Sequence, residues 1–101
     1  MPPHPESVAA FARWAGVAAK RYQKRHVIWE IWNEPNLHFW KPKPDLKEYT
    51  ALALATCQAV RAADPRATLV GPATSEIPLK FLDSFFTSGV LAQLDAVSVH
   101  P

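Results

Sequence analysis

The chain has 101 residues, of which 49% are apolar and 20% are charged, values that suit one soluble globular domain with a sizeable core. Its net charge of +2 is too small to argue for binding to nucleic acid or to an anionic membrane surface. No apolar run is long enough to cross a bilayer, so no transmembrane helix is predicted.

Residues 6–24 are predicted to form a helix, because their apolar side chains recur at helical spacing. Lys20, Arg21, Lys24 and Arg25 gather at its end, where cations favour the negative pole of the helix dipole. The expected apolar stripe consists of Val8, Phe11, Ala12, Ala15, Ala18, Ala19 and Tyr22.

The next segment, HVIWEIWNEP at residues 26–35, is rich in β-branched and aromatic residues and is predicted to be a strand. A proline-containing loop follows. A second helix is predicted to begin at Asp45, which stands three residues before Glu48, the spacing of a capping box. Its expected inner face consists of Tyr49, Leu52, Ala53, Thr56, Val60 and Ala63, and Asp64-Pro65 is expected to stop it.

Two more strands and one helix are predicted in the second half. The run ATLVGP, residues 67–72, has the pattern of a buried strand, and LDAVSVHP, residues 94–101, of a third strand. Between them, residues 78–88 are predicted to be a helix that Gly89 stops. Its inward side chains are expected to be Phe81, Leu82, Phe85 and Phe86.

Helices thus alternate with strands along the whole sequence. This order predicts right-handed βαβ units and a parallel sheet in an α/β fold. A parallel sheet of only three strands leaves unpaired backbone groups at both edges, which is unusual for a complete domain. We therefore expect residues 1–101 to be one partial domain, the middle of a larger parallel structure. No secretory signal stands at the N-terminus, which leaves localisation open, and the parent could be a secreted protein.

The cysteine and three of the histidines give no sign of a metal or cofactor. Cys57 cannot form an intramolecular disulfide, and we expect it to be a buried structural thiol. His4, His26 and His38 do not have the spacing of metal ligands. We therefore propose neither a metal nor another cofactor.

The segment WEIWNEPN, residues 29–36, places two carboxylates, Glu30 and Glu34, in an otherwise apolar strand. Asn33 adds an amide beside Glu34. A carboxyl group can move a proton, an amide can bond a hydroxyl, and aromatic rings can stack on the C–H faces of a sugar. The set therefore suits a carbohydrate, and the aromatic faces come from Trp29, Trp32 and Trp40.

WEIWNEPN resembles the acid/base strand of clan A glycoside hydrolases, most closely the β-xylosidase-like family 39, whose domain is a cellulase-type (β/α)8 barrel. The flanking segments resemble the same barrel, from the helix before its fourth strand to its sixth strand. The resemblance implies a parallel βαβαβ part of a (β/α)8 TIM barrel, preceded by a helix, with strands equivalent to four, five and six. It also implies hydrolysis of β-glycosidic bonds in an oligosaccharide or polysaccharide, with retention of configuration.

Residue by residue, the resemblance places the general acid/base at Glu34, a hydrogen bond to the sugar 2-hydroxyl at Asn33, and His100 in the wall of the site. The family's nucleophile, a second glutamate, would lie on a seventh strand, which this sequence does not contain. From the residues alone, Glu34 could instead be a surface turn carboxylate, and His100 a polar residue at a strand end.

Other residues of the expected site carry alternatives of their own. A strict two-residue period places Glu30, Trp32 and Glu34 on one face of the strand and Asn33 on the other, so Asn33 and Glu34 can both face a sugar only if the strand twists or bulges at its end. Glu30 is expected to be a paired carboxylate inside the barrel. Trp40 could stack on a sugar or pack within its loop. Glu76 follows the second strand, on the side of barrel active-site loops, so it could contact substrate, but an exposed loop carboxylate is the default interpretation.

Three functions remain open from the sequence. The chain could belong to a retaining glycosidase completed by missing strands, it could be a minimal hydrolase completed by self-association, or it could bind sugar or merely fold without turnover. The open strand edges favour a homodimer or larger oligomer, because unpaired edges and apolar patches attract another chain. The residues expected to face water at these edges are Val27, Ile28, Ile31, Val97 and Val99.

Overall fold

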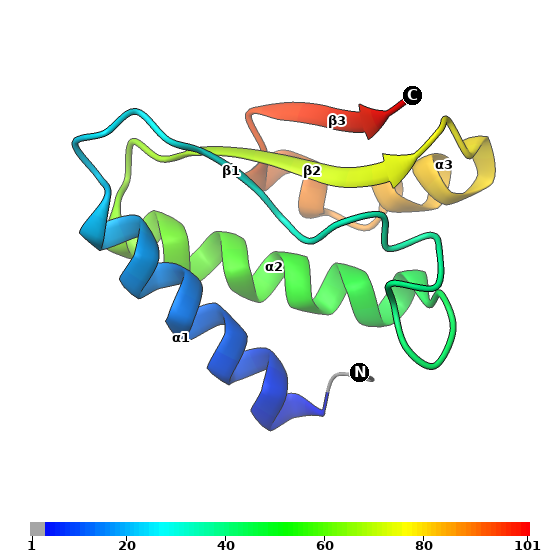
Figure 1. The fold of residues 1–101 in the computed structure, drawn as a ribbon, viewed down its shortest axis with the longest axis horizontal. Helices are drawn as coiled ribbons and strands as arrows, with labels where there is room; N and C mark the ends of the chain where they lie inside the picture. Colours follow the sequence, from blue (N-terminus) through cyan, green and yellow to red (C-terminus); the bar gives the residue numbers. More distant parts are fainter. Residues whose placement is uncertain (1–3) are drawn as a thin grey trace.

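Three α-helices alternate with three parallel strands along the chain (Figure 1). The structure is a computed structural model that describes residues 4–101. The predicted α/β order is confirmed. The elements are α1 (Pro5–Arg21), β1 (Ile28–Glu30), α2 (Leu46–Ala63), β2 (Thr68–Ser75), α3 (Leu79–Thr87), the short 3-10 helix η1 (Val90–Gln93) and β3 (Ala96–His100).

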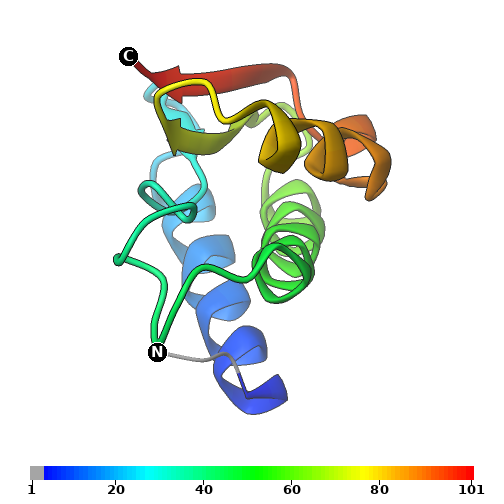
Figure 2. The same ribbon diagram turned by 90° about the vertical axis from the view of Figure 1, so that its right-hand side faces the viewer.

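The strands form one sheet in the order β1-β2-β3, and both neighbouring pairs are parallel. Helices α1 and α2 lie together beneath the sheet, while α3 lies beside the end of β2 (Figures 1 and 2). Because the strands are parallel, their carboxyl ends meet at one edge of the sheet. Active sites of parallel α/β proteins lie at this edge, so the fold brings three separate segments of the chain together there.

Small residues allow α1 to approach α2 closely. A Cβ atom added at Gly16 would lie 3.3 Å from the carbonyl oxygen of Ala59 on α2, a distance that leaves little room for a larger side chain. Tyr22 was wrongly predicted to face inward: α1 ends at Arg21, and 47% of Tyr22 is exposed. The buried residues of α1 are Ala12, Ala15, Gly16 and Ala19.

Helix α2 begins as the sequence predicts, because the Asp45 carboxylate accepts a hydrogen bond from the Glu48 amide at 3.0 Å. Its buried face contains all the predicted residues except Ala63, which is half-buried. Cys57 is fully buried on the same face. Burial raises the pKa of its thiol to about 11, so the thiol is protonated and packs as a small apolar group.

Helix α3 buries one narrow stripe. Leu82 and Phe85 are buried, whereas Phe86, predicted to point inward, is 39% exposed. Phe86 follows Phe85 by 100° around the helix, which turns its ring toward the solvent-facing side. Gly89 ends the helix as predicted, with the positive φ of +93° that glycine adopts readily.

The first strand is much shorter than predicted. The sequence predicts extended structure from 26 to 35, but β1 contains only Ile28–Glu30. Trp32 and Glu34 have φ angles of +73° and +47°, which are incompatible with an extended strand. The same turn carries Ile31 into the core, where it is 3% exposed, so the prediction that Ile31 faces water is wrong.

Other apolar residues at the sheet edges are exposed, as expected. Ile28 is 66% exposed, Val97 44% and Val99 36%, while Val27 is half-buried. The oligomer inferred from these edges stays a prediction. Within residues 4–101, no helix combines the length and apolar composition needed to cross a membrane.

An ion pair between Arg61 and Asp95 joins α2 to the amino end of the sheet. The Arg61 guanidinium donates to the Asp95 carboxylate at 2.8 Å and to the backbone carbonyl oxygens of Ala67 and Gln93. The same Asp95 oxygen accepts from the Leu69 amide at 2.8 Å. The hydrogen bond from Leu69, followed by that from Arg61, lowers the pKa of Asp95.

Replacing Asp95 with asparagine should therefore lower the free energy of unfolding at neutral pH by about 1 kcal/mol, a modest figure because the side chain is half exposed. A lowered pKa in the folded state stabilises the protein above the ordinary Asp pKa of about 3.9, and this contribution disappears as the pH falls through the lowered value. Urea unfolding at several pH values should show the difference between the two proteins shrinking on acidification. Asp83→Asn, at an exposed position on α3, is the control and should change stability little at any pH.

Candidate active site

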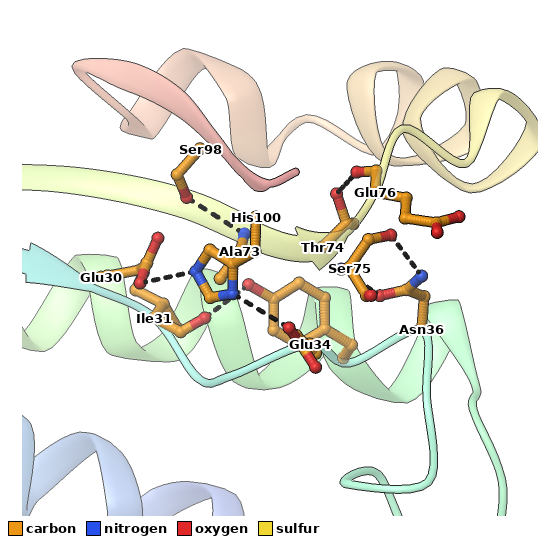
Figure 3. Close-up of polar contacts among 11 residues, drawn as sticks. Glu30, Ile31, Glu34, Asn36, Ala73, Thr74, Ser75, Glu76, Ser98 and His100 are labelled. Carbon is orange, nitrogen blue, oxygen red and sulfur yellow. Dashed lines mark hydrogen bonds and ion pairs between the residues drawn. The ribbon is translucent and has the colours of Figure 1, made fainter.

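Two glutamates and one histidine meet at the carboxyl edge of the sheet (Figure 3). His100 Nδ1 lies 3.3 Å from Glu34 Oε1, and His100 Nε2 lies 3.2 Å from Glu30 Oε2. Glu30 ends β1, Glu34 follows it, and His100 ends β3, so the contacts pass over the middle strand β2. All three side chains are partly open to solvent, at 33% for His100, 36% for Glu30 and 21% for Glu34.

The path of the chain after β1 explains how both glutamates reach the same imidazole. The Ile31 amide still donates to the Val70 carbonyl oxygen at 3.1 Å, and three residues later the Glu34 amide donates to the Ala73 carbonyl oxygen at 2.8 Å. Between these bonds the backbone turns through the left-handed conformation of Trp32. The anchored turn presents the Glu34 side chain to the edge where Glu30 already lies.

Because of this turn, the expectation that a regular strand places Trp32 beside Glu30 and Glu34 is wrong. Trp32 does not join Glu30 and Glu34 at the imidazole of His100. Its ring packs 5.7 Å from Phe11 of α1 and 5.2 Å from Trp40, measured between ring centroids. The left-handed residue rotates the side chain toward the helices, which a sequence pattern of regular strand cannot anticipate.

Left-handed backbone conformations gather at the same edge. Trp32, Glu34, Ala73 and Glu76 all have positive φ angles between 47° and 73°; Ala73 lies near the end of β2, and the other three follow β1 or β2. His26, which precedes β1, is the other described non-glycine residue with a positive φ. Such conformations cost free energy in residues other than glycine and cluster at functional sites, where surrounding contacts hold them. Their position supports a functional role for this edge.

A buried tyrosine holds the turn from below. Tyr49 of α2 is fully buried and donates its hydroxyl to the Ile31 carbonyl oxygen at 2.8 Å. Burial, more than any nearby charge, raises the pKa of Tyr49, so the hydroxyl stays protonated and remains a donor. The contact fixes the residue that separates Glu30 from the turn leading to Glu34.

Asn36 is a positioning residue that the sequence pattern did not single out. Its side-chain amide donates to the Ser75 carbonyl oxygen at 3.1 Å, and its side-chain oxygen accepts from the Ser75 amide at 2.9 Å. In the register of the sheet, Ser75 stands opposite His100. The amide thus ties the segment of Glu34 to the strand beside His100, and its only sequence signal was its place immediately after the Asn-Glu-Pro motif.

Hydrogen bonds donated by two backbone amides complete the edge on the side of β3. The Ala73 amide donates to the Ser98 hydroxyl oxygen at 3.1 Å, and the Glu76 amide donates to the His100 carbonyl oxygen at 2.7 Å. The strand pairing is irregular between Pro72 and Thr74. These bonds hold the backbone of His100 in place while its ring reaches over β2.

The two carboxylates also change the titration of the imidazole. Hydrogen bonds from His100 to Glu30 first, and to Glu34 second, raise the pKa of His100. A histidine whose pKa is raised on folding stabilises the folded state fully below its ordinary pKa of about 6.5, and this stabilisation is lost as the pH rises through the raised value. The imidazolium form is therefore the form that this site favours.

The remaining predicted site residues lie elsewhere around the edge. Asn33 is exposed and lines a surface hollow of about 430 Å³ together with Trp14, Glu30, Trp32 and Phe39. None of the described hydrogen bonds joins Asn33 to Glu34. Asn33 remains a predicted substrate-binding residue because it borders this hollow.

The side chains of Trp40 and Glu76 do not face the cluster of Glu30, Glu34 and His100. Trp40 is only 1% exposed and packs edge-on against Tyr49, which favours the packing alternative over stacking on sugar. Glu76 is exposed, and Figure 3 shows its carboxylate pointing away from Glu34 and His100. Only its backbone contacts His100, so the structure gives no support to Glu76 as a second carboxylate beside Glu34.

This arrangement is suited to proton transfer. A carboxyl group held at hydrogen-bond distance from an imidazole can exchange a proton with it. Glu30 and Glu34 contact different nitrogens of the ring and so do not converge on a common point. Among residues 4–101, no group of three or more His, Cys, Asp or Glu side chains is arranged to hold a metal ion.

A parallel α/β sheet with acids and a histidine at its carboxyl edge is consistent with part of a (β/α)8 barrel, a class of fold whose active sites lie at that end. Within this class, the chain belongs to glycosyl hydrolases family 39, because the sequence profile of that family matches residues 8–101. The resemblance of WEIWNEPN to this family is therefore confirmed.

Individual relatives agree with this assignment. A β-xylosidase of Geobacillus stearothermophilus is 45% identical over 47 residues, which are 46% of this chain and 9% of that protein. The crystal structure of a monomeric β-xylosidase from Caulobacter crescentus CB15 is 27% identical, with a TM-score of 0.71, and covers 92% of this chain. The fold also matches the GH39 enzyme of Xanthomonas axonopodis pv. citri, at 22% identity over 93% of this chain with a TM-score of 0.71. The chain spans 20% of each of the two solved structures.

Proposed function

We propose that this chain supplies the acid/base side of a glycosidase active site that cleaves β-linked sugars, with β-xylosides as the substrate class. Glu34 is the proposed general acid/base. The observation that carries the proposal is the place of Glu34: partly open to solvent at the carboxyl edge, with Oε1 at 3.3 Å from His100 Nδ1. Family membership supports the reaction, and the names of the Geobacillus and Caulobacter relatives support the sugar.

The proposed place of the chain in a barrel is consistent with its strand order. We assign β1, β2 and β3 to strands four, five and six of a (β/α)8 barrel, and residues 1–101 to one part of its catalytic domain. The parallel order β1-β2-β3 and the TM-scores of 0.71 to family 39 structures support this assignment. On this assignment the open face of the sheet, which carries Glu30 and His100, is turned toward the barrel interior.

Retaining hydrolysis needs a second carboxyl group about 5–5.5 Å from the acid/base. Glu30 does not fit this role, because the imidazole of His100 lies between its carboxylate and that of Glu34, where the sugar carbon would have to be. We propose that the nucleophile comes from a seventh strand that is not among these residues. The Caulobacter relative is described as monomeric, so it lends no support to a site shared between copies.

Each proposed residue has a defined role in the reaction. Glu34 protonates the glycosidic oxygen as the leaving group departs, and then removes a proton from the water that releases the sugar from the nucleophile. Asn33 binds the sugar 2-hydroxyl, a contact that its exposed amide can make, while His100 forms the wall behind Glu34.

The product of hydrolysis tests this proposal directly. With the whole protein that carries this sequence, we expect turnover of an aryl β-xyloside and, by proton NMR at early times, release of β-xylose with retained configuration. Release of the α-anomer would contradict the retaining pair, since inversion requires two carboxyl groups about 6.5–9.5 Å apart. Binding of xylo-oligosaccharide without turnover would favour the sugar-binding alternative instead.

A further inference from the structure

The His100 imidazole bridges the carboxylates of Glu30 and Glu34, and this bridge restricts where protons can lie. A neutral imidazole has one N–H group, and its other nitrogen can only accept a hydrogen bond. An ionised carboxylate has only acceptor oxygens. His100 presents Nε2 to Glu30 at 3.2 Å and Nδ1 to Glu34 at 3.3 Å, so each contact requires a proton of its own.

Three proton arrangements satisfy both contacts. In the first, the ring is an imidazolium that donates from Nε2 to the Glu30 carboxylate and from Nδ1 to the Glu34 carboxylate. In the second, the ring is neutral with its proton on Nε2, and Nδ1 accepts a hydrogen bond from the protonated Glu34 carboxyl group. In the third, the ring is neutral with its proton on Nδ1, and Nε2 accepts from a protonated Glu30. Moving one proton between Nδ1 and Glu34 Oε1 converts the first arrangement into the second with no other change.

We propose that Glu30 is a positioning residue that keeps a proton on His100 Nε2, so that His100 Nδ1 and Glu34 Oε1 share the proton of the acid/base. This inference rests on the proposed role of Glu34. Glu30 itself touches neither the glycosidic oxygen nor Glu34. Its effect passes through the ring, as a carboxylate fixes the tautomer of a catalytic histidine in other enzymes.

The surroundings of the ring assign this task to Glu30 alone among the neighbouring acids. The His100 ring contacts Glu30, which is on β1, and Glu34, which is in the turn after β1. After β2 the nearest acid is Glu76, whose carboxylate points away while its backbone amide binds the His100 carbonyl oxygen (Figure 3). Ser75, opposite His100 in the register, has its backbone amide and carbonyl occupied by Asn36.

The first test is the tautomer and titration of His100, which needs no turnover. The ring nitrogens of the four histidines can be followed by two-bond ¹H–¹⁵N NMR, with His100 assigned from a His100→Gln sample. Above its midpoint, His100 should show the Nε2–H tautomer. In Glu30→Gln, which keeps the size of the side chain, the midpoint should fall and the two neutral tautomers should mix.

Matched variants make this result specific. Glu34→Gln should lower the midpoint less than Glu30→Gln, and Glu76→Gln, which removes a charge at the same edge outside the bridge, should leave the tautomer unchanged. A dominant Nδ1–H tautomer in the unmodified protein would overturn the inference. So would a His100 midpoint and tautomer that Glu30→Gln leaves as they were.

The second test is the pH–rate profile of the whole protein on a β-xyloside with a poor leaving group. Removing the negative charge of Glu30 lowers the proton affinity of the His100–Glu34 pair, so the basic limb of kcat/KM should move to lower pH. Up to about a 100-fold fall in kcat is expected, the scale of a misplaced catalytic group, with KM nearly unchanged. A rise in KM with an unmoved profile would show Glu30 to be a substrate contact instead and would overturn the inference. The NMR result does not depend on turnover, so failure of the Glu34 assignment would be recognised separately.

Discussion

Replacing Glu34 with glutamine is expected to lower kcat/KM by about 10²- to 10⁴-fold on β-xylosides with poor leaving groups, the usual contribution of general acid catalysis. Glutamine keeps the size of the side chain and can still bond to His100, but it carries no transferable proton. Activated aryl xylosides should lose much less in kcat/KM, because their leaving groups depart with little protonation. The measurement is a leaving-group series with both proteins.

The contrast between substrates is what identifies the acid/base. Equal losses across the series would show that Glu34→Gln damages binding or folding, and the assignment would fail. Asp83→Asn removes an exposed carboxylate of α3 that makes no contact with the cluster of Glu30, Glu34 and His100, and it is the matched control for a change of one charge. It should leave the whole series unchanged.

The largest effect on stability is expected at Tyr49. Tyr49→Ala removes a fully buried ring that stacks 6.0 Å from Phe85 and meets Trp40 edge-on at 5.7 Å. Large-to-small changes of this kind cost about 3–5 kcal/mol, a large share of the 5–15 kcal/mol that stabilises a typical domain. The loss of the hydroxyl adds to this, because the Ile31 carbonyl oxygen loses its donor.

Tyr49→Phe isolates the contribution of the hydroxyl. The ring stays, and we expect a loss of about 1–3 kcal/mol from the buried carbonyl oxygen left without this donor. Tyr22→Phe is the matched control, since the chain has two tyrosines and Tyr22 is 47% exposed. Urea unfolding of the three variants gives the comparison. Similar values for Tyr49→Phe and Tyr22→Phe would mean that the hydroxyl does not hold the turn after β1.

Several features follow from the sequence alone because they depend on neighbours along the chain. The apolar spacing gave the three helices, the capping position of Asp45 was correct, and Gly89 ends α3 where a positive φ is required. Alternation of helices and strands was enough to predict parallel pairing. The motif around Glu34 placed a candidate acid at a strand end, and family 39 membership confirms the origin of that motif.

Tertiary contacts decided what the strand after Glu30 does. A regular pattern predicted ten extended residues, but β1 has three, because a turn through Trp32 and Glu34 is held by the Ala73 carbonyl oxygen and by Tyr49. Left-handed residues other than glycine are unfavourable locally, so no local pattern predicts them. The same turn buries Ile31 and aims Trp32 at the helices, both contrary to expectation.

The sequence by itself therefore determined the α/β fold class and indicated Glu34 as the candidate acid, since periodicity, capping and a contiguous motif are local properties. It did not determine the partners of that acid. Glu34 and His100 stand 66 positions apart, Glu30 and His100 70, and Asn36 and Ser75 39. Which side chains meet across these separations depends on strand register and on the strained turn, and both exist only once α1, α2 and the sheet have packed together.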